Sequence, residues 1–360
     1  MGPKNIIVAT GGTAGHIFPA ISVGLLLKER GYDVLFIGNR SIEEYLGSFD
    51  FSYELIESPK EPKKLRSLFS LLKGIWQSFK IFRKFRPDAV IGFGGYTTIP
   101  TLLMAKFMGI KIYIHEQNLY VGDTNRFFLK YARCVFTSLQ EIYGISIDYK
   151  DRVYFTGNPV RREIKELYNL SDFQYPKEDE TFNILITGGS GGSSFLATEL
   201  LKAFRFLKKE TKHKIHIFHQ VKREEEIEIA TSFYEKEAIV AEVKLFFKDL
   251  VKKILQSHLI ICRAGMGTSS ELAAIGRPAI FIPSPNVKNN HQLHNAKFFE
   301  RSGACLILEE SNFSPESFAS SLESLMGDRE KLLDLASNMK KLAITDAEEK
   351  IVNYIDDDII

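Results

Sequence analysis

The sequence predicts an α/β protein built from two Rossmann-like domains, each a doubly wound sheet of parallel strands. Two glycine-rich turns carry this prediction, Thr10 to His16 and Thr187 to Ser193, because each follows a short apolar run and precedes a helix-like one. The segments between them alternate strand and helix patterns, which is typical of βαβ units. At 360 residues, the chain is too long for one ordinary α/β core and is of the right length for two.

The alternation can be followed along the whole chain. In the first half the patterns predict strands at 5–10, 34–38, 52–56, 89–94, 111–116, 134–138 and 153–157, with a helix over 18–30 that ends at Gly31. In the second half they predict strands at 182–187, 215–220, 243–247, 258–262, 278–283 and 304–308, with a helix over 195–208. We expect an N-terminal domain over 1–160 and a C-terminal domain over 161–340. A tail over 341–360 is expected to be helical and to pack back on the N-terminal domain.

Composition indicates a globular protein of a reducing compartment. Hydrophobic residues make up 44% of the chain and charged residues 26%. The three cysteines, Cys134, Cys262 and Cys305, lie in apolar strand-like contexts without paired spacing, which favours buried thiols over disulfides or a metal site. The chain opens without a signal-peptide pattern, and no apolar run approaches the ~20 residues that span a bilayer. We therefore expect a cytoplasmic protein whose contact with membranes, if any, is peripheral.

Both glycine-rich turns are suited to anionic ligands. Missing side chains let backbone N–H groups approach a ligand, and the dipole of the following helix favours negative charge. Neither turn reads as the dinucleotide fingerprint G-x-G-x-x-G, and neither ends in the Gly-Lys-Ser/Thr of a P-loop. The turns therefore predict binding of a phosphate or a developing oxyanion. The first turn contains His16 and the second has no histidine, which indicates that the two domains have different functions.

Polar and glycine residues gather where the predicted strands end. Open α/β sheets bind ligands beyond the carboxyl ends of their strands, so these residues predict an active site in a cleft between the domains. They are His16, Gly94 to Tyr96, His115 to Asn118, Asn158, Arg161, Ser190, and the segment Arg263 to Glu271.

Taken together, these motifs resemble the MurG family of N-acetylglucosaminyltransferases, which complete the lipid-linked disaccharide of bacterial peptidoglycan. The motifs are residues 11–19, Gly94-Gly95-Tyr96 with Pro100, His115 to Asn118 with Gly122 and Asn125, residues 156–161, Gly188-Gly189-Ser190, and residues 262–265 with Glu271. They occur in the right order from about residue 6 to about residue 300. The resemblance implies the GT-B fold, in which two Rossmann-like domains face each other across a cleft, the first holding the acceptor and the second most of the UDP-sugar.

The resemblance implies that His16 is the catalytic base. An imidazole that titrates near neutral pH can take the proton of an attacking sugar hydroxyl. The alternative is a histidine at a helix start that bonds only to the main chain.

The resemblance also implies a set of substrate-binding residues. Glu271 would accept hydrogen bonds from the ribose diol, Arg161 would stabilise the leaving diphosphate, and Ser190 would donate to a phosphate oxygen. Gln292 would contact the donor sugar, and the main chain of Phe247 would hold the uracil edge. The full set is Thr13, Ala14, Gly15, Asn118, Arg161, Ser190, Phe247, Met266, Gly267, Thr268, Ser269, Ser270, Glu271 and Gln292. A solvated Glu271, a surface ion pair at Arg161 and a helix cap at Ser190 are the simpler alternatives.

Further residues of the N-terminal domain are acceptor-site candidates. They are Gly94, Gly95, Tyr96, His115, Glu116 and Asn125. His115 and Glu116 are equally interpretable as a buried structural pair.

The sequence departs from the family pattern at two places. The second glycine turn reads Gly-Gly-Ser-Gly-Gly-Ser instead of Gly-Gly-Ser-Gln-Gly-Ala, so a glutamine side chain is missing at Gly191, and Ala14 replaces a glycine. No Asp-x-Asp motif ends a strand. We therefore expect no metal and no cofactor, with helix dipoles and Arg161 neutralising the diphosphate.

A basic amphipathic run predicts contact with a membrane surface. Residues 65–86 combine an apolar stripe at helical spacing with six cations and no acid, and residues 1–160 carry 20 Lys and Arg against 14 Asp and Glu. The residues expected at the lipid surface are Leu72, Lys73, Ile75, Trp76, Phe79, Lys80 and Arg83. The alternative is a packed helix whose apolar stripe faces the sheet.

The sequence therefore predicts an inverting glycosyltransferase at the cytoplasmic face of the bacterial inner membrane. By the resemblance, it moves N-acetylglucosamine from UDP-N-acetylglucosamine to the C4 hydroxyl of a polyprenyl-diphosphate-linked N-acetylmuramyl pentapeptide. Its other expected partners are anionic inner-membrane lipid and proteins of cell-wall synthesis and division, with no nucleic acid. The alternatives are another GT-B UDP-sugar transferase, a UDP-N-acetylglucosamine epimerase, and a non-catalytic UDP-sugar sensor.

Overall fold

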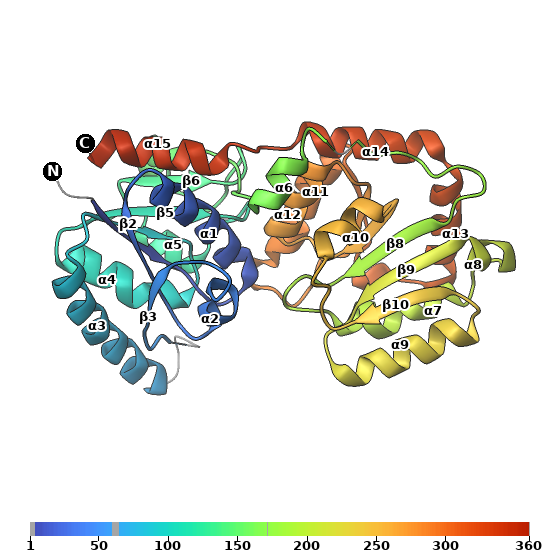
Figure 1. Ribbon diagram of the computed structural model, residues 1–360, viewed down its shortest axis with the longest axis horizontal. Coiled ribbons are helices and arrows are strands. Elements are labelled where there is room, and N and C mark those ends of the chain that lie inside the picture. Colours follow the sequence, from blue (N-terminus) through green and yellow to red (C-terminus); the bar gives the residue numbers. More distant parts are fainter. Residues whose placement is uncertain (1–3, 60–64, 171, 360) are drawn as a thin grey trace. The chain divides into compact units, whose positions relative to one another are not determined.

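The computed structural model describes residues 4–59, 65–170 and 172–359, with the side chains of residues 65 and 66 excepted. The chain divides into two compact units. Unit 1 comprises Met1–Arg162 and Ile344–Ile360, and unit 2 comprises Glu163–Ala343. Figure 1 labels their helices and strands.

Unit 1 contains a seven-stranded parallel sheet in the order β3-β2-β1-β4-β5-β6-β7. The strands are β1 (Asn5–Ala9), β2 (Asp33–Gly38), β3 (Ser52–Leu55), β4 (Ala89–Gly92), β5 (Lys111–Glu116), β6 (Cys134–Thr137) and β7 (Val153–Phe155). The helices of this unit are α1 (Ala14–Glu29), α2 (Ser41–Leu46), α3 (Leu65–Phe85), α4 (Ile99–Phe107), α5 (Asp123–Phe128) and α15 (Ala347–Ile359), with short 3₁₀ turns η1 (Tyr96–Thr98) and η2 (Ile147–Arg152).

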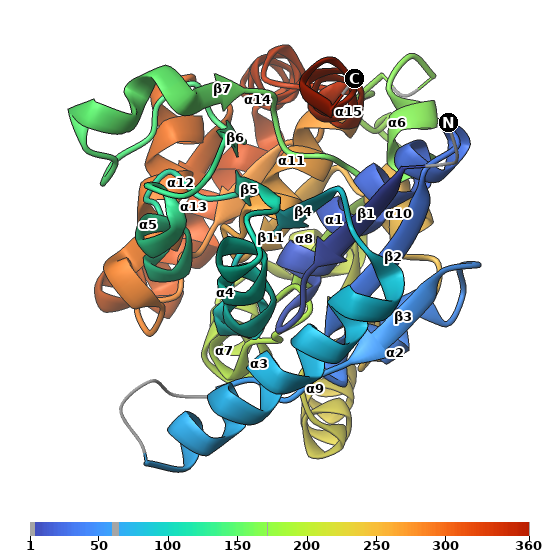
Figure 2. The same ribbon diagram turned by 90° about the vertical axis from the view of Figure 1, so that its left-hand side faces the viewer.

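Both faces of the central part of this sheet are covered, which is why β1, β4, β5 and β6 are almost continuously buried. Along β1, Ile6 and Val8 pack with residues of α1 and α15, whereas Ile7 and Ala9 pack with residues of α3 and α4. Figures 1 and 2 show α1 and α15 on one side and α3 and α4 on the other. The C-terminal helix α15 is therefore part of the core of unit 1, through Ile351, Val352 and Ile355.

Unit 2 contains a six-stranded parallel sheet in the order β10-β9-β8-β11-β12-β13. The strands are β8 (Phe182–Thr187), β9 (Ile215–Gln220), β10 (Val240–Lys244), β11 (Leu259–Cys262), β12 (Ala279–Phe281) and β13 (Cys305–Ile307). The helical elements after unit 1 are α6 (Arg162–Leu167), the π-helical η3 (Phe195–Glu199), α7 (Leu200–Phe204), α8 (Lys209–Lys214), α9 (Glu224–Lys236), α10 (Leu250–Gln256), α11 (Met266–Ile275), η4 (Lys288–Asn290), α12 (His291–Arg301), η5 (Glu310–Asn312), α13 (Pro315–Gly327) and α14 (Arg329–Lys341).

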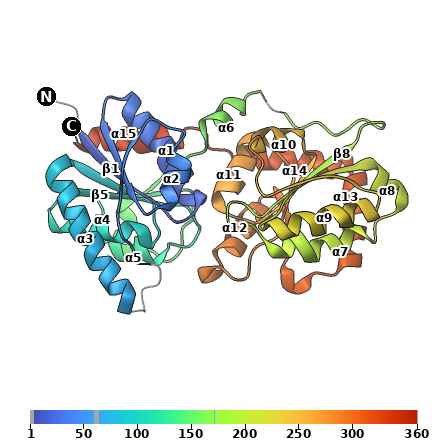
Figure 3. The same cartoon turned by 60° about the horizontal axis from the view of Figure 1, so that its bottom comes forward.

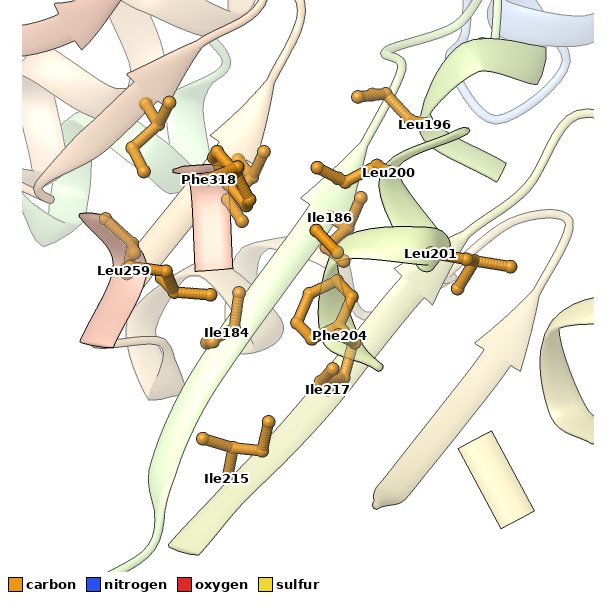
Figure 4. Close-up of a cluster of buried hydrophobic side chains, with 14 of the residues drawn as sticks. Ile184, Ile186, Leu196, Leu200, Leu201, Phe204, Ile215, Ile217, Leu259 and Phe318 are labelled. Carbon is orange, nitrogen blue, oxygen red and sulfur yellow. The ribbon is translucent and has the colours of Figure 1, made fainter. Parts of the chain in front are cut away.

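The core of unit 2 lies between its sheet and the helices α7, α9 and α13. Ile184 and Ile186 of β8 pack against Leu200 and Phe204 of α7, and Phe318 of α13 joins the same cluster (Figure 4). Figure 3 shows α7 and α9 on one side of this sheet and α10 and α11 on the other. The two parallel, doubly wound sheets confirm the predicted fold class.

Three predicted elements differ from the structure by more than two residues. The helix expected from residue 18 begins at Ala14, directly after the glycine turn, with Pro19 inside it. The helix expected over 195–208 is a π-helical turn followed by the five-residue α7. The strand expected at 243–247 is β10 at Val240–Lys244, because these residues pair with 216–220 and Phe247 turns into the core beyond the strand.

Candidate active site

In unit 1, the candidate residues meet at the carboxyl ends of three strands. Gly11 to His16 follow β1, Gly94 and Gly95 follow β4, and His115 to Asn118 end β5 and follow it. Because β4 lies between β1 and β5 in the sheet, these three segments are neighbours. The first helix begins at Ala14, so its N-terminal end points toward the same edge.

The double glycine after β4 makes room for the imidazole of His16. Gly94 and Gly95 have φ values of 85° and 78°, a region that favours glycine. A Cβ atom at Gly94 would lie 3.4 Å from Cε1 of His16, and one at Gly95 would lie 3.7 Å from Cδ2. Side chains at these positions would therefore be strained and would crowd the ring.

A hydrogen bond fixes one side of the His16 ring. Its Nδ1 atom lies 3.0 Å from Oε1 of Gln117. Burial lowers the pKa of His16 below its usual 6.5, while the bonds to Gln117 and to the backbone of Phe93 act in the opposite direction. The ring is therefore neutral at pH 7, as a proton acceptor must be. Because Nδ1 is the atom that bonds to Gln117, Nε2 is the nitrogen on the other side of the ring.

His115 is fully buried and bonds away from Glu116. Its Nδ1 atom lies 3.1 Å from Nε2 of Gln117, and its Nε2 atom lies 3.3 Å from the carbonyl oxygen of Gly157. Burial lowers the pKa of His115 to about 4, so this ring is also neutral. Nε2 of Gln117 donates in addition to the carbonyl oxygen of Phe93, at 3.0 Å.

Glu116 stabilises the loop that follows β5 through hydrogen bonds. Its carboxylate accepts hydrogen bonds from the backbone N–H of Gly122 at 2.9 Å and from that of Asn118 at 3.0 Å, and from Nδ2 of Asn125 at 2.8 Å. Burial raises the pKa of Glu116, and these hydrogen bonds work against the rise. Among the described residues, the buried Oδ1 atom of Asn125 has no hydrogen-bond partner, so it remains available as an acceptor.

The other candidates of unit 1 surround this cluster or lie beside it. Thr13 is the N-cap position of α1 but makes no side-chain cap bond, and Tyr96 is half-buried in η1. The guanidinium carbon of Arg161 lies 5.1 Å from the ring centre of Phe18, two residues beyond His16 on α1. Arg162 points elsewhere, because it pairs with Glu29 at 2.9 Å.

In unit 2, the second glycine turn lies beside the start of α11. A Cβ atom at Gly189 would lie 3.8 Å from Oγ1 of Thr268, in the first turn of that helix. The backbone N–H of Gly189 donates to Oγ1 of Thr187, which donates to Oε1 of the buried Gln220. Strands β8 and β11 are neighbours, so this turn and the N-terminal end of α11 form one polar edge.

Arg263 forms hydrogen bonds with the second glycine turn and with the residue that follows β12. Its Nη2 atom donates to Oγ of Ser193 at 2.6 Å, and its Nη1 atom donates to the carbonyl oxygen of Ile282 at 3.0 Å. Ser193 also accepts the backbone N–H of Leu196, so it caps the following helical turn and Ser190 does not. The sequence identified Arg263 as part of a motif, but its hydrogen bonds to Ser193 and Ile282 could be found only in the structure.

The remaining donor candidates differ in exposure. Met266 and Ser269 are buried, and Oγ of Ser269 donates to the carbonyl of Gly265, whereas Gly267, Thr268, Ser270 and Glu271 are half-buried at the start of α11. Oε1 of Gln292 accepts the backbone N–H of Ser284 at 2.9 Å. Phe247 is buried beyond β10, and Ser190 is exposed in the turn.

The helix α3 is only partly packed. Ile75 and Phe79 pack against the core of unit 1, whereas Leu68, Phe69, Leu72 and Trp76 have more than half of their surface exposed, with Phe69 at 68%. Nζ of Lys80 lies 3.4 Å from the ring centre of Trp76, and Lys73 pairs with Glu57 at 3.4 Å. Two of the residues expected at a lipid surface, Ile75 and Phe79, are therefore half-buried against the core, and Leu68 and Phe69 extend the exposed stripe. None of the helices, within the residues described, is both long and apolar enough to cross a membrane.

Family models match both units. The glycosyltransferase family 28 N-terminal domain matches residues 6–137, and the C-terminal domain of the same family matches residues 183–351. Among solved structures, the MurG of Acinetobacter baumannii is similar over 99% of this chain and 100% of its own, with 29% identity and a TM-score of 0.78. A UDP-GlcNAc 2-epimerase from Neisseria meningitidis, 14% identical with a TM-score of 0.67, shares the fold.

Two curated relatives carry the same name, UDP-N-acetylglucosamine–N-acetylmuramyl-(pentapeptide) pyrophosphoryl-undecaprenol N-acetylglucosamine transferase. The relative from Geobacter sulfurreducens is 36% identical over 97% of this chain and 97% of its own length. The relative from Wolbachia pipientis is 35% identical over 97% of this chain and 98% of its own length. Similarity of this extent confirms the resemblance read from the motifs, and the chain belongs to the MurG family of glycosyltransferase family 28.

Proposed function

We propose that the protein transfers N-acetylglucosamine from UDP-N-acetylglucosamine to the C4 hydroxyl of undecaprenyl-diphospho-N-acetylmuramyl pentapeptide, with inversion at the anomeric carbon. The observation that carries this proposal is the state of His16, a neutral imidazole in the first turn of α1 that is held through Nδ1 by Gln117. The names of the relatives supply the substrates.

The proposed step uses His16 as the general base. The C4 oxygen of the acceptor forms a bond to the anomeric carbon of the donor while its proton passes to Nε2 of His16. The bond between that carbon and the diphosphate oxygen breaks, and its electron pair leaves with UDP. The neutral state of the ring supports this role, since an imidazolium could not accept the proton.

Unit 2 is proposed to hold the donor. The glycine turn at 188–192 and the N-terminal end of α11 would bind the diphosphate through backbone N–H groups, Ser190 and Thr268. Glu271 would accept hydrogen bonds from the ribose, Gln292 would contact the sugar and the main chain of Phe247 would hold the uracil edge. The proximity of Gly189 to the side chain of Thr268 supports the proposal that the glycine turn and the start of α11 bind the same anion.

Unit 1 is proposed to hold the acceptor. Gly94 and Gly95 lie beside His16, and Tyr96 follows them. Asn125, whose buried Oδ1 has no hydrogen-bond partner among the described residues, would accept from a sugar hydroxyl. Arg161, on the same unit as His16, would add positive charge as the diphosphate leaves.

The exposed stripe of α3 is proposed to meet the membrane that carries the acceptor lipid. Aromatic and aliphatic side chains with Lys80 and Arg83 beside them are suited to an anionic lipid surface. The protein would then work as a peripheral enzyme at the cytoplasmic face of the bacterial inner membrane, where other cell-wall synthesis and division proteins would be its neighbours.

The proposal is tested by asking whether the donor turns over alone. Purified protein is incubated with UDP-N-acetylglucosamine, with and without a lipid-diphosphate-linked N-acetylmuramyl pentapeptide. A transferase releases UDP only when the acceptor is present, whereas an epimerase changes the sugar without it, and a sensor changes nothing.

A further inference from the structure

The side chains of His16, Gln117 and His115 form a continuous hydrogen-bonded row. The row runs from Nδ1 of His16 to Oε1 of Gln117 at 3.0 Å, and from Nε2 of Gln117 to Nδ1 of His115 at 3.1 Å. It ends where Nε2 of His115 meets the carbonyl oxygen of Gly157 at 3.3 Å. Gln117 and His115 are almost fully buried, so water does not replace these partners.

Two backbone carbonyls fix the direction of every hydrogen bond in this row. The Phe93 carbonyl, 3.0 Å from the Gln117 amide, can only accept, so the atom facing it is the NH₂ group and the oxygen faces His16. The Gly157 carbonyl can also only accept, so His115 carries its proton on Nε2 and leaves Nδ1 as an acceptor. That acceptor faces the NH₂ group of Gln117, and the two assignments agree.

We propose that Gln117 is a positioning residue that selects the tautomer of His16. Because the amide oxygen of Gln117 accepts and cannot donate, Nδ1 of His16 carries the proton and Nε2 presents its lone pair. This inference rests on the proposed function, since only a base needs that lone pair. His115 and Gly157 complete the row, because their hydrogen bonds prevent the side-chain amide of Gln117 from flipping.

The choice of an amide has a chemical consequence. A carboxylate in this place would orient the ring equally well but would also favour its protonated form. The amide orients the ring without adding a negative charge. The row itself contains one further titratable group, His115. Glu116, the next residue of β5, is held by backbone N–H groups and by Asn125. Arg161 lies over Phe18 on α1.

The far end of the row is a glycine. Gly157 has a φ of 90°, and a Cβ atom there would lie 2.5 Å from Cγ2 of Ile344, where the chain returns to unit 1. The residue whose carbonyl bonds to His115 therefore lies against Ile344 of the C-terminal segment, with no space for a side chain. The row connects this segment to the ring of His16 within unit 1.

The tautomer can be measured directly by NMR of the protein labelled with ¹⁵N-histidine, in which the His16 signals are identified by their loss in His16→Ala. We expect Nδ1–H in the parent protein. In Gln117→Met, which fills similar space but makes neither bond, we expect the Nε2–H form to predominate. The signals of His219, which bonds to Tyr234 in unit 2, should not move and report that the fold is intact.

Turnover gives the second readout. Gln117→Met should lower kcat with the acceptor by about 10- to 100-fold, the range for partners that orient a functional histidine, with unchanged UDP-N-acetylglucosamine affinity. Gln117→Glu should keep the Nδ1–H form and move the acid limb of the pH profile upward by about one unit or more, because a carboxylate favours imidazolium.

The outcomes separate this inference from the proposed function. An Nε2–H tautomer in the parent protein, or an Nδ1–H tautomer that survives in Gln117→Met, overturns the positioning role of Gln117. A tautomer that changes as expected while turnover and its pH profile stay as in the parent upholds the role of Gln117 and removes His16 as the base.

Discussion

The carboxylate of Asp358, in the last turn of α15, accepts a hydrogen bond from Nη2 of Arg133 at 2.6 Å. Its other oxygen accepts from the hydroxyl of Tyr113 at 2.5 Å, and Nζ of Lys111 lies 3.6 Å away. The bond to Arg133 is the largest of the causes that hold the pKa of Asp358 at about 2, against a usual 3.8. The last turn of the chain is therefore fixed to β5 and to the residue before β6.

We predict that Asp358→Asn lowers the free energy of unfolding by about 1 kcal/mol at pH 7. This is less than the pKa shift alone implies, because solvent screens the ion pairs of a partly exposed carboxylate. Because the pKa is lowered in the folded protein, this stabilisation is complete above about pH 4. It is lost as the pH falls toward 2. Urea unfolding from pH 7 to pH 2.5 measures the difference between variant and parent. Asp357→Asn is the matched control, because Asp357 is exposed one position away. Equal losses in the two variants would contradict the role of Asp358.

The strand ends of this fold could be predicted from the sequence, because parallel strands with two covered faces are almost continuously apolar and stop where polar residues begin. His16, the double glycine and the segment at 115–118 were located in this way. The row from His16 to Gly157 could not be predicted, since its members come from α1, β5 and the loop after β7. A buried glutamine beside a histidine carries no pattern in sequence that distinguishes a tautomer-setting partner from a core amide.

The stripe on α3 shows a different limit. Helical spacing identified the apolar positions, but the division of that stripe between core and surface depends on where the sheet lies. Ile75 and Phe79 pack inward, whereas Leu72 and Trp76 stay exposed. Similarly, the strand at residues 240–244 begins earlier than expected, because hydrophobicity alone favours residues 245–247 and pairing with β9 decides otherwise.

The role of His16 is tested by its removal. His16→Ala should lower turnover by about 10²–10⁴-fold, the usual contribution of a general base, with donor affinity little changed because the ring belongs to unit 1. Steady-state rates and calorimetric binding of UDP-N-acetylglucosamine measure the two quantities. His213→Ala, on an exposed part of α8, is the control. A near-normal rate in His16→Ala would remove the residue from the mechanism.

The donor assignment is tested at the start of α11. Glu271→Ala should weaken the binding of UDP by roughly 1–3 kcal/mol, the range for hydrogen bonds to a charged acceptor. The fold should survive, since the side chain is half-buried and not part of the core. Glu228→Ala, on the exposed face of α9, should leave UDP binding unchanged. Calorimetry that finds equal UDP affinity in both variants would refute the ribose contact.

The membrane surface is tested with vesicles of anionic lipid. Replacing Lys73, Lys80 and Arg83 by glutamine together with Trp76→Ser should release the protein from the vesicles, because each cation contributes about 1 kcal/mol near such a surface. Activity on a short-chain soluble acceptor should remain.

Two controls accompany this variant. A protein with Lys209, Lys214 and Lys236 of unit 2 replaced by glutamine should still sediment with vesicles. Release of the parent by high salt should follow from screening over roughly 8–10 Å. If the α3 variant sediments as the parent does at all salt concentrations, the membrane contact lies on another surface.

Transfer of N-acetylglucosamine to the acceptor with inversion is tested by the structure of the product. The protein is incubated with UDP-N-acetylglucosamine and a lipid-diphosphate-linked N-acetylmuramyl pentapeptide, and the product is examined by NMR for its anomeric coupling and its linkage position. We expect a β-linked disaccharide at the C4 oxygen, formed in amounts equal to the UDP released. An α-linked product, a linkage to another hydroxyl, or release of UDP with free sugar as the only product would contradict it.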